Sequence, residues 1–430
     1  MPCRKRQGIF FCFIIKKKAM FKKITIFLLL FFCFITRAQQ VTTVTGFAGF
    51  ADGTLATAQF SSPRGICADQ TGTILYVADS GNNLIRKIDL NANFVSTIAG
   101  STEGYADGIG TSAQFYRPVG VCLDSNGFLF VAEALNHKIR KIDLTTNTVT
   151  TFAGSTQGYA NGTGTTAKFN NPTGICIDTN NNLYVSEYFG NKIRKITPTR
   201  QVTNYAGSGL ATFADGIGTA ASFYSPLALC SDAQNNIYVS DSFNSKIRKI
   251  EPNGMVTTIT GIDGGYIDGT LSQAKFIIPD GICIDSNNNL YVNDLNNKIR
   301  KIDLNAGIVS TLLDLAPVNG DPRGICYINN TIYFTEFGGC KIKKITDFLA
   351  TENFEQNIIK LYPNPNKGKF KINIDTNFKI EIYDILGQLV YNKVENQNET
   401  EIETALKKGI YFVKIINEES KIATQKMVVE

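Results

Sequence analysis

The chain has 430 residues, of which 43% are hydrophobic and 19% are charged, a composition typical of globular proteins with two or three domains. Its formal net charge is +6. Residues 1–37 carry nine lysines and arginines and no acidic residue, and taking these nine away leaves a net charge of −3 for the rest. A mildly acidic chain has no general attraction to nucleic acid, and we expect none as a partner.

The N-terminal region, residues 1–38, is predicted to be a signal peptide, with Met20 as an alternative start. Two lysines precede the apolar run Ile24–Ile35, and Thr36–Ala38 follows it as the cleavage site. The run of twelve apolar residues is too short to cross a bilayer comfortably. We therefore expect an exported protein without a transmembrane span in its mature form.

The middle of the chain repeats one unit. Its closing tripeptide Ile-Arg-Lys, or Ile-Lys-Lys in the last copy, recurs in steps of 54, 54, 54, 52 and 43 residues, at Ile85, Ile139, Ile193, Ile247, Ile299 and Ile342. Each unit holds four stretches rich in Ile, Val, Tyr or Thr and bounded by Asn, Gly or Pro, which is typical of β-strands. In the third unit these are Gly174–Asp178, Leu183–Glu187, Lys192–Ile196 and Val202–Ala206. Four strands per repeat indicate the blade of a β-propeller.

The two ends of the repeat region complete one blade between them. The region begins with Val41–Thr45, which matches a fourth strand, and it ends at Ile345 after a third strand. Each strand type then occurs six times, provided that the N-terminal strand joins the last three. Residues 39–347 are therefore predicted to form an all-β, six-bladed propeller whose N-terminal strand closes the last blade, because closure leaves no unpaired ends.

One face of the predicted propeller collects the repeated polar residues. The loop entering a first strand and the turn between the second and third strands lie on this face, here called the loop face, because neighbouring strands are antiparallel. Its features are the Asp-Gly loops (Asp52, Asp107, Asn161, Asp215, Asp268) and the acids that end the second strands (Asp79, Glu133, Glu187, Asp241, Asp294, Glu336). Their recurrence favours a structural role, with each acid accepting backbone N–H groups in its own turn. Calcium ligation is the alternative.

Two positions on the loop face vary from unit to unit, and they are predicted to form a binding surface. One position follows the proline of the Pro-x-Gly motif, and the other follows the acid that ends the second strand. In chain order they are Arg64, Ser80, Val119, Ala134, Thr173, Tyr188, Leu227, Ser242, Asp280, Leu295, Arg323 and Phe337. Residues that vary while the rest of the repeat stays constant are typical of a surface that binds a protein or a glycan. Sequence drift at positions that tolerate substitution produces the same pattern.

Catalytic and metal-binding residues are scarce. His137 is the only histidine, and it lies in a turn where sister units have Asn or Ser, so we expect a solvated turn residue. One histidine cannot build a histidine-based zinc site or, without a positioned partner, a Ser-His-Asp triad. We therefore predict no catalytic residues, no metal site and no cofactor. A calcium-dependent hydrolase, lactonase or lyase that uses carboxylates on the same frame is the alternative.

Six cysteines occupy one equivalent position, the third residue of each first strand: Cys67, Cys122, Cys176, Cys230, Cys283 and Cys326. Equivalent positions on neighbouring blades diverge around the axis, whereas a disulfide requires Cα atoms within about 7 Å of each other. We therefore expect unpaired, small buried side chains.

The repeat resembles the NHL-repeat family of propellers over about residues 41–346. The three short motifs of the family stand in the third unit as Pro172–Asp178 (PTGICID), Asn182–Glu187 (NLYVSE) and Asn191–Ile196 (NKIRKI). The resemblance implies a rigid platform for partners, with enzymes a minority.

After a polar linker, residues 348–354, alternating strands in residues 355–430 predict a small antiparallel β-sandwich. This segment resembles the type A C-terminal sorting domain of the type IX secretion system in its YPNP motif, its Asp-Ile-Leu-Gly turn and its Gly-Ile-Tyr-Phe-Val strand. The residues that carry the match are Pro363, Asn364, Pro365, Gly387, Gly409 and Tyr411. The resemblance implies export by the type IX machinery, after which the domain is removed and the protein is anchored at the cell surface or released.

Overall fold

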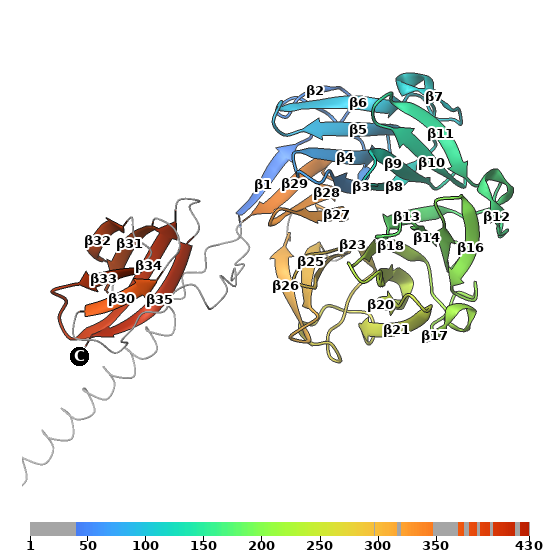
Figure 1. The fold of residues 1–430 in the computed structure, drawn as a ribbon. Helices are drawn as coiled ribbons and strands as arrows, with labels where there is room; N and C mark the ends of the chain where they lie inside the picture. Colours follow the sequence, from blue (N-terminus) through green and yellow to red (C-terminus); the bar gives the residue numbers. More distant parts are fainter. Residues whose placement is uncertain are drawn as a thin grey trace, which may run out of the picture. The chain divides into compact units, whose positions relative to one another are not determined.

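The computed structural model describes residues 40–295, 297–315, 320–346, 369–373, 378–384, 388–395, 399–417 and 422–429. The chain divides into two compact units between Phe348 and Leu349, and each unit is described separately. Strands make up nearly all of the regular structure, and the described part of the chain contains no α-helix (Figure 1). The all-β prediction is therefore confirmed. The predicted signal peptide, residues 1–38, and the predicted linker, residues 348–354, lie outside the described residues.

The first unit contains six antiparallel sheets, the blades. Each innermost strand begins at a proline, because proline is tolerated at the first residue of a strand. The innermost strands are β3 (Pro63–Ala68), β8 (Pro118–Leu123), β13 (Pro172–Ile177), β18 (Pro226–Ser231), β23 (Pro279–Ile284) and β27 (Pro322–Ile328). The second strands, each ending at an acid, are β4 (Ile74–Asp79), β9 (Phe128–Glu133), β14 (Leu183–Glu187), β19 (Ile237–Asp241), β24 (Asn289–Asp294) and β28 (Thr331–Glu336).

A third and a fourth strand form the outer half of each blade. The third strands are β5 (Leu84–Asp89), β10 (Lys138–Asp143), β15 (Lys192–Ile196), β20 (Lys246–Ile250), β25 (Lys298–Asp303) and β29 (Lys341–Thr346). The fourth strands are β6 (Phe94–Gly100), β11 (Thr148–Ala153), β16 (Gln201–Ala206), β21 (Met255–Thr260), β26 (Ile308–Asp314) and, in the last blade, β1 (Gln40–Thr45).

Short elements complete the blades. Five fourth strands pair with a two-residue strand from the Asp-Gly loop, namely β2 (Gly53–Thr54), β7 (Gly108–Ile109), β12 (Gly162–Thr163), β17 (Gly216–Ile217) and β22 (Gly269–Thr270). The 3₁₀ turns in the described ranges are η1 (Gly110–Ser112), η2 (Gly164–Thr166), η3 (Gly218–Ala220) and η4 (Ser242–Asn244).

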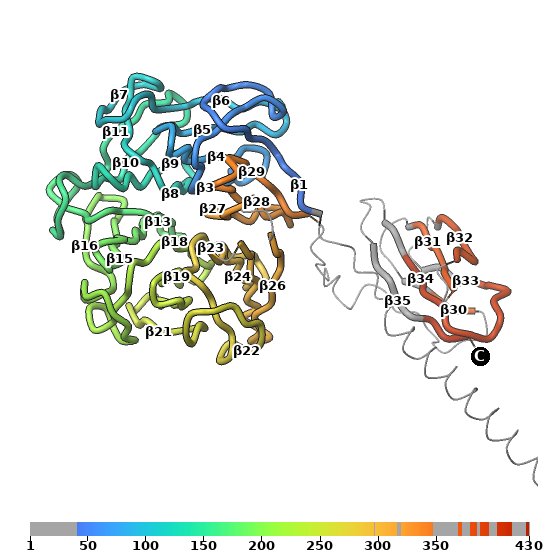
Figure 2. The backbone as a smooth tube through the Cα atoms, turned by 180° about the vertical axis from the view of Figure 1, so that it is seen from behind, coloured from blue at the N-terminus to red at the C-terminus, as the bar shows by residue number. Residues whose placement is uncertain are grey.

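The N-terminal strand belongs to the last blade. β1 pairs antiparallel with β29, with Val41 opposite Ile345, and the order of this sheet is β1-β29-β28-β27. The innermost strands contact one another in the order β3, β8, β13, β18, β23 and β27, and β27 also contacts β3. The blades are therefore arranged around a common axis, which Figure 1 and Figure 2 show from opposite sides.

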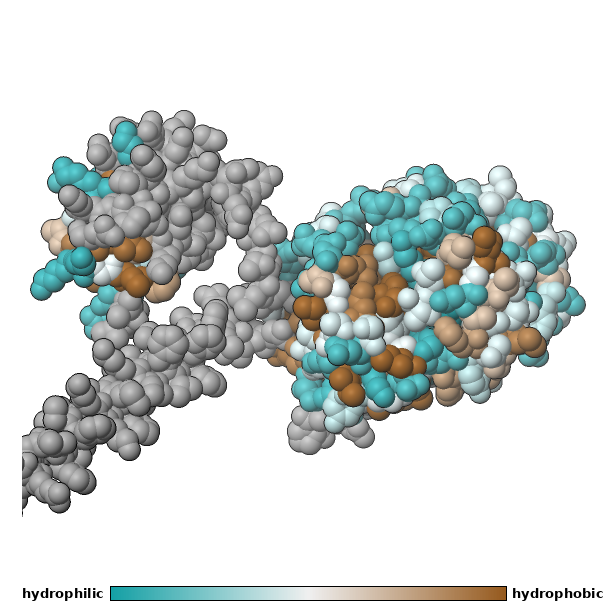
Figure 3. Space-filling view, turned by 90° about the horizontal axis from the view of Figure 1, so that it is seen from below, coloured by the Kyte–Doolittle hydropathy of each residue, from teal (hydrophilic) through white to brown (hydrophobic). Residues whose placement is uncertain are grey.

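The surface of the propeller carries apolar side chains in separate patches. Figure 3 shows such patches among hydrophilic residues on one side of the first unit. Exposed apolar side chains include Phe50, Ile217 and Tyr266. Scattered exposure of this kind is normal in folded proteins, so exposure alone does not identify a binding site.

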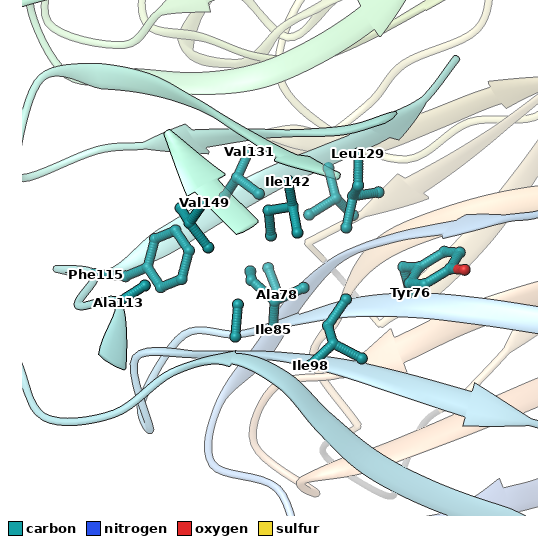
Figure 4. Close-up of a cluster of buried hydrophobic side chains, with 12 residues drawn as sticks. Tyr76, Ala78, Ile85, Ile98, Ala113, Phe115, Leu129, Val131, Ile142 and Val149 are labelled. Atoms are coloured by element: carbon teal, nitrogen blue, oxygen red, sulfur yellow. The ribbon is translucent and has the colours of Figure 1, made fainter. Parts of the chain in front are cut away.

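Apolar side chains fill the space between neighbouring blades. Figure 4 shows one such cluster, in which Ala78 and Ile85 of the first blade lie opposite Leu129 and Val131 of the second. All four are fully buried. Because each blade is apolar on both faces, removing these faces from water favours stacking of the blades around the axis.

A buried arginine in each of the first five blades joins several segments of the loop face. In the first blade the Arg86 guanidinium lies 2.9 Å from Asp79 Oδ2 and 2.8 Å from Asp52 Oδ1, and it donates to the carbonyl oxygens of Ala51 and Gln59. The equivalent side chains are Arg140, Arg194, Arg248 and Arg300, each with at most 2% of its surface exposed. The basic third strands are therefore part of the interior.

The acids that end the second strands have a wider role than the predicted one. Asp79 Oδ1 accepts the N–H of Ser61, 2.7 Å away, in the loop that enters the blade, and Asp79 Oδ2 accepts the side-chain amide of Asn82 in the turn that follows. The same carboxylate pairs with Arg86. Since Asp52 of the Asp-Gly loop binds this guanidinium as well, both sets of acids are held by a cation that belongs to the protein.

The seven cysteines within the described ranges are free. Cys122, Cys176 and Cys283 are buried, and the remaining first-strand cysteines are half-buried. Burial raises the pKa of the Cys122 thiol, which disfavours the reactive thiolate. The cysteines are therefore the unpaired, small side chains that the sequence predicts.

The glycine of the Pro-x-Gly motif lies where neighbouring innermost strands approach each other. A Cβ atom on Gly65 would lie 2.4 Å from the carbonyl oxygen of Val119 on the next blade. Gly120, Gly174, Gly281 and Gly324 are equally close to the following blade, at 2.1 to 2.3 Å. The fourth blade departs from this pattern because it carries Ala228 at the same position.

The second unit contains two antiparallel sheets. One pairs β30 (Lys369–Asn373) with β33 (Glu399–Glu403), and the other has the order β32 (Leu389–Glu395), β31 (Phe378–Tyr383), β34 (Gly409–Asn417), β35 (Ile422–Val429). Phe370 and Ile402 of the first sheet pack with Ile382 and Tyr411 of the second in one buried cluster. Of the predicted sorting residues, Gly409 begins β34 and Tyr411 lies in this core. The others lie outside the described residues: Pro363, Asn364, Pro365 and Gly387.

Replacing Gly65 with alanine should destabilise the propeller by about 1–3 kcal/mol, because the added methyl group has no room beside the next innermost strand. Thermal and urea unfolding, followed by circular dichroism, measure the loss. Ala228→Gly is the matched control, since it restores the motif in the blade that departs from it, and it should change stability by no more than about 1 kcal/mol. Equal losses in both variants would show that stability does not depend on this close approach.

Candidate functional site

The residues that follow the proline of each Pro-x-Gly motif meet around the axis of the propeller. The innermost strands surround a cavity of about 90 Å³, here called the channel mouth. One of the two variable positions predicted from the sequence lines it in every blade: Arg64, Val119, Thr173, Leu227, Asp280 and Arg323. The structure thus brings six residues that are far apart in the sequence together at one place.

Two arginines lie side by side at the channel mouth. Arg64 and Arg323 are both over the ring of Phe337, at 4.9 and 5.4 Å from its centroid. Arg323 is paired, since its Nη1 lies 2.9 Å from Asp280 Oδ2 and its Nε lies 2.9 Å from Asp321 Oδ1. Cation–π attraction and these ion pairs hold the arginines beside the closure between the last blade and the first.

Arg64 differs from the other arginines of the loop face. Within the described ranges its guanidinium makes no ion pair and donates no hydrogen bond, whereas that of Arg323 binds two acids. The buried Nε without an acceptor is common to Arg64 and the other loop-face arginines. Burial lowers the pKa of Arg64, and the nearby Asp280 opposes this effect. An arginine stays protonated in proteins, so Arg64 presents a positive charge whose hydrogen-bond donors are available to a ligand.

The second variable position, after the strand-two acid, is occupied by buried side chains in several blades. The Ser80 hydroxyl donates to the carbonyl oxygen of Pro118, and the Ser242 hydroxyl donates to that of Pro279 at 2.5 Å. Ala134 is buried as well. These three residues connect one blade to the next and have no access to a partner.

Aromatic side chains from the third and fourth blades form a cluster on the loop face. The ring of Tyr188 lies 4.8 Å from Phe189 and 6.1 Å from Phe243, which lies 5.1 Å from Tyr224. Phe189 and Phe243 are 58% and 45% exposed. Burial raises the pKa of Tyr188, a hydrogen bond with Ser225 opposes this effect, and the charges of Asp280 and Arg64 make smaller contributions.

The remaining predicted residues differ in their surroundings. Leu295 is half-buried, and Thr173 is buried with its hydroxyl 3.1 Å from the Ser186 hydroxyl. The sequence does not single out Asp321 or Tyr224. Asp321 lies just before Pro322 and Tyr224 just before Pro226, and both prolines begin innermost strands. This closeness is the signal in the sequence that could have indicated the two residues.

His137 is a structural residue that joins two blades. Its Nδ1 accepts the N–H of Asn171 on the next blade, at 3.1 Å, and its backbone is left-handed with φ of 56°. Asn83 Oδ1 and Asn191 Oδ1 accept the equivalent N–H groups in sister blades, at 2.9 and 2.8 Å. The expectation of a solvated turn residue is wrong, because the imidazole is half-buried against the neighbouring blade.

Glu187 is a carboxyl group with a perturbed pKa, as candidate acids and bases often are. Burial raises the pKa of Glu187 to about 7, although Arg194 lies 3.2 Å from it. Its Oε2 has no hydrogen-bond partner, because Gly190 stands where sister turns have an asparagine such as Asn82. The carboxyl group is fully buried and has no access to a substrate.

Carboxylates that could hold a metal are not clustered. In the residues that the structure describes, no group of three or more His, Cys, Asp or Glu side chains is placed to bind a metal ion. The Asp107 carboxylate, for example, is held by Arg140 at 2.7 Å and by the N–H and hydroxyl of Thr151 at 3.1 and 3.0 Å. The Asp-Gly loops therefore use their acids for contacts within the blade.

Comparison with known proteins identifies both units. A family described as a secretion system C-terminal sorting domain matches residues 360–430, and the NHL repeat matches residues 115–142. The chain thus carries an NHL repeat in its first unit and a secretion sorting domain at its C-terminus. That domain marks proteins that the type IX system exports to the cell surface or the extracellular space. Across the described ranges, no helix is long and apolar enough to span a membrane.

Named relatives match about three fifths of the chain. The protein SUPPRESSOR OF QUENCHING 1, chloroplastic, of Arabidopsis thaliana is 32% identical over 293 residues, which cover 63% of this chain and 28% of that protein. NHL repeat-containing protein 2 of Homo sapiens is 31% identical over 305 residues, covering 61% and 42%. The chain therefore spans less than half the length of these relatives.

A solved structure shows the same fold. An auxiliary nutrient binding protein from Bacteroides thetaiotaomicron superposes with a TM-score of 0.55 at 14% identity, covering 71% of this chain and 76% of that one. At this identity the likeness concerns the fold alone.

His137→Asn should remove a pH-dependent part of the stability. Burial, followed by the charge of Lys138, lowers the pKa of His137 in the folded protein. The stability that the neutral imidazole contributes is therefore complete above the unfolded pKa of about 6.5, and it is lost as the pH falls through the lower folded pKa. Because the imidazole is partly solvated, we expect about 0.5 kcal/mol or less. The difference in melting temperature between variant and wild type is measured at pH 7.5 and pH 5.5. A difference that does not change with pH would contradict the neutral acceptor role.

Proposed function

We propose that this protein is an exported binding propeller that recognises a protein or glycan partner with its loop face, through an anionic group that sits at the channel mouth. One observation carries the proposal. Arg64 lies over Phe337 at the mouth, and among the described residues its guanidinium makes no ion pair, whereas the neighbouring Arg323 makes two. A charged guanidinium that the protein leaves without an ion-pair partner attracts an anionic group.

The charges around Arg64 define the kind of group that fits. Arg64 interacts electrostatically with Arg117 and Arg323 and with Asp280 and Asp321. Three positive charges face two negative ones, so one positive charge is uncompensated. A carboxylate or sulfate would neutralise it and would match the planar guanidinium with two hydrogen bonds.

The aromatic cluster of Tyr188, Phe189, Tyr224 and Phe243 extends the proposed site beyond the mouth. A cavity of about 90 Å³ holds only a small group, so the rest of the partner must lie on the surface around it. Exposed rings next to an arginine are typical of the residues that dominate binding energy at interfaces. The fold that this chain shares with a protein named as nutrient-binding is compatible with a binding role.

We further propose a division of the chain into a signal region (1–38), the propeller (39–347), a linker (348–354) and the sorting domain (355–430). If it is correct, the extracellular protein begins near Gln39 and lacks most of residues 355–430, because both targeting segments are removed during export. Intact mass spectrometry of the secreted protein decides the point. A full-length product retained in the cell would contradict the export route.

Arg64→Ala should weaken partner binding by about 1–3 kcal/mol and leave the melting temperature nearly unchanged. The probe is the strongest ligand of the wild-type protein in a screen of acidic glycans and acidic peptides, measured by titration calorimetry. Arg323→Ala is a poorer test than the sequence suggests, because it would leave the buried Asp280 without its cation and cost stability.

Two controls accompany Arg64→Ala. Arg200→Ala removes an arginine from a turn on the opposite face, and it should leave binding unchanged. Arg140→Ala removes a fully buried partner of Glu133, and it should lower stability by several kcal/mol. Equal binding by wild type and Arg64→Ala would show that the channel mouth is not the site.

A further inference from the structure

A second hollow lies on the face opposite the loop face, between the fourth and fifth blades. Its volume is about 320 Å³, within the range of ligand-binding pockets, and we call it the rear groove. Turns that join first to second strands and third to fourth strands border it, and these turns lie at the opposite strand ends from the loop face. The residues that matter below are Asp232, Gln234, Asn236, Lys249, Ile259 and Asn305.

The groove is open because an aromatic ring present in a sister blade is absent. In the third blade Tyr205 lies at the bulge of the fourth strand, and its ring packs at 4.9 Å against Tyr184. In the fourth blade the same bulge carries Ile259, beside Tyr238. The ring of Tyr205 fills the space beside this bulge in the third blade. Ile259 is smaller and leaves the equivalent space in the fourth blade unfilled.

A hydrogen-bonded link is also missing at this interface. Between the third and fourth blades, Asn235 Oδ1 accepts the N–H and the hydroxyl of Thr179 at 3.0 and 2.8 Å. One blade further on, the position of Thr179 is taken by Ala233, which has no hydroxyl. The rear groove therefore lies where two features that close the preceding interface are both lost.

The first blade shows that an isoleucine at the bulge is not enough by itself. Ile98 occupies the position of Ile259, but Ile74 packs into the same interface. The fourth blade has Asn236 in the place of Ile74, and its amide is turned to Asp232 Oδ2 at 2.7 Å. The rear groove thus lacks the apolar side chain that Ile74 provides in the first blade, and it is lined by polar groups in its place.

The lining indicates the class of ligand. Gln234, Asn236 and Asn305 bring amide groups, which both donate and accept hydrogen bonds, as sugar hydroxyls do. The Nδ2 atoms of Asn236 and Asn305 each donate one hydrogen bond within the protein, to Asp232 and to the carbonyl oxygen of Asn287, which leaves their second N–H and their amide oxygens for a ligand. The charge of Lys249 is matched by Glu251, 3.4 Å from its Nζ, and the carboxylate of Asp232 also lines the groove. An anion would therefore find no uncompensated positive charge.

We infer that the rear groove binds a neutral saccharide unit, with its hydroxyl groups on the amides and its C–H face on Ile259 and Leu304. The volume of about 320 Å³ suits a ligand of one or two sugar rings. This site is independent of the channel mouth, because it lies on the opposite face and has no surplus positive charge.

The test uses the full chain and three neutral probes: cellotriose, maltotriose and mannotriose, each titrated by calorimetry. The wild-type protein should bind at least one of them, and Ile259→Tyr should weaken that binding at least tenfold, because it introduces the ring that fills the sister interface. Gln234→Ala should weaken it severalfold. Asn180→Ala, at the equivalent turn position of the third blade, is the matched control and should bind as the wild type does.

Several results would overturn the inference. Wild-type protein that binds none of the three probes has no such site. Binding that Ile259→Tyr leaves intact, with a normal unfolding transition, places the sugar elsewhere. If Arg64→Ala abolishes saccharide binding and Ile259→Tyr does not, the channel mouth is the sugar site, so the two proposals fail separately. If Ile259→Tyr does not fold, the comparison of Gln234→Ala with Asn180→Ala replaces it. Equal saccharide affinities of these two variants would show that the sugar does not bind in the rear groove.

Discussion

The buried arginine of each blade is the interaction on which the loop face depends. A fully desolvated guanidinium is unfavourable unless its charge and its donors are satisfied. Arg86 meets most of this requirement through its two terminal nitrogens, which bind the acid of the second strand, the acid of the Asp-Gly loop and two loop carbonyl oxygens, while its Nε has no acceptor. The loops are held in place from within the blade, and their outer residues are free to differ from one unit to the next.

The last blade departs from this arrangement, and the candidate site lies beside it. Its third strand carries Lys343 in place of arginine, which pairs with Glu336 at 2.6 Å, and its fourth strand is supplied by the N-terminus. Phe337 follows the acid of this blade and supports Arg64 and Arg323. A ligand that lacks the symmetry of the frame must be recognised where the frame is broken, and the closure is one such place.

The rear groove is another such place, with a different chemistry. At the mouth the break in the repeat adds positive charge around Arg64. Between the fourth and fifth blades it removes an aromatic ring, at Ile259, and a hydroxyl group, at Ala233. Both features arise from single side chains on a rigid frame, so the two faces can bind chemically different ligands without any change in the fold.

The period, the strands, the pairing of the first strand with the last blade and the sorting domain could all be predicted from the sequence, because these depend on local patterns and on counting. The accessibility of the variable residues could not be predicted in this way. Ser80 and Ser242 occupy the same kind of position as Phe337, yet they bond to the next blade. Arg64 and Arg323 look equivalent in the sequence, but only Arg323 forms ion pairs in the described part of the chain. Such differences depend on contacts between blades, which join residues far apart in the chain and leave no periodic signal.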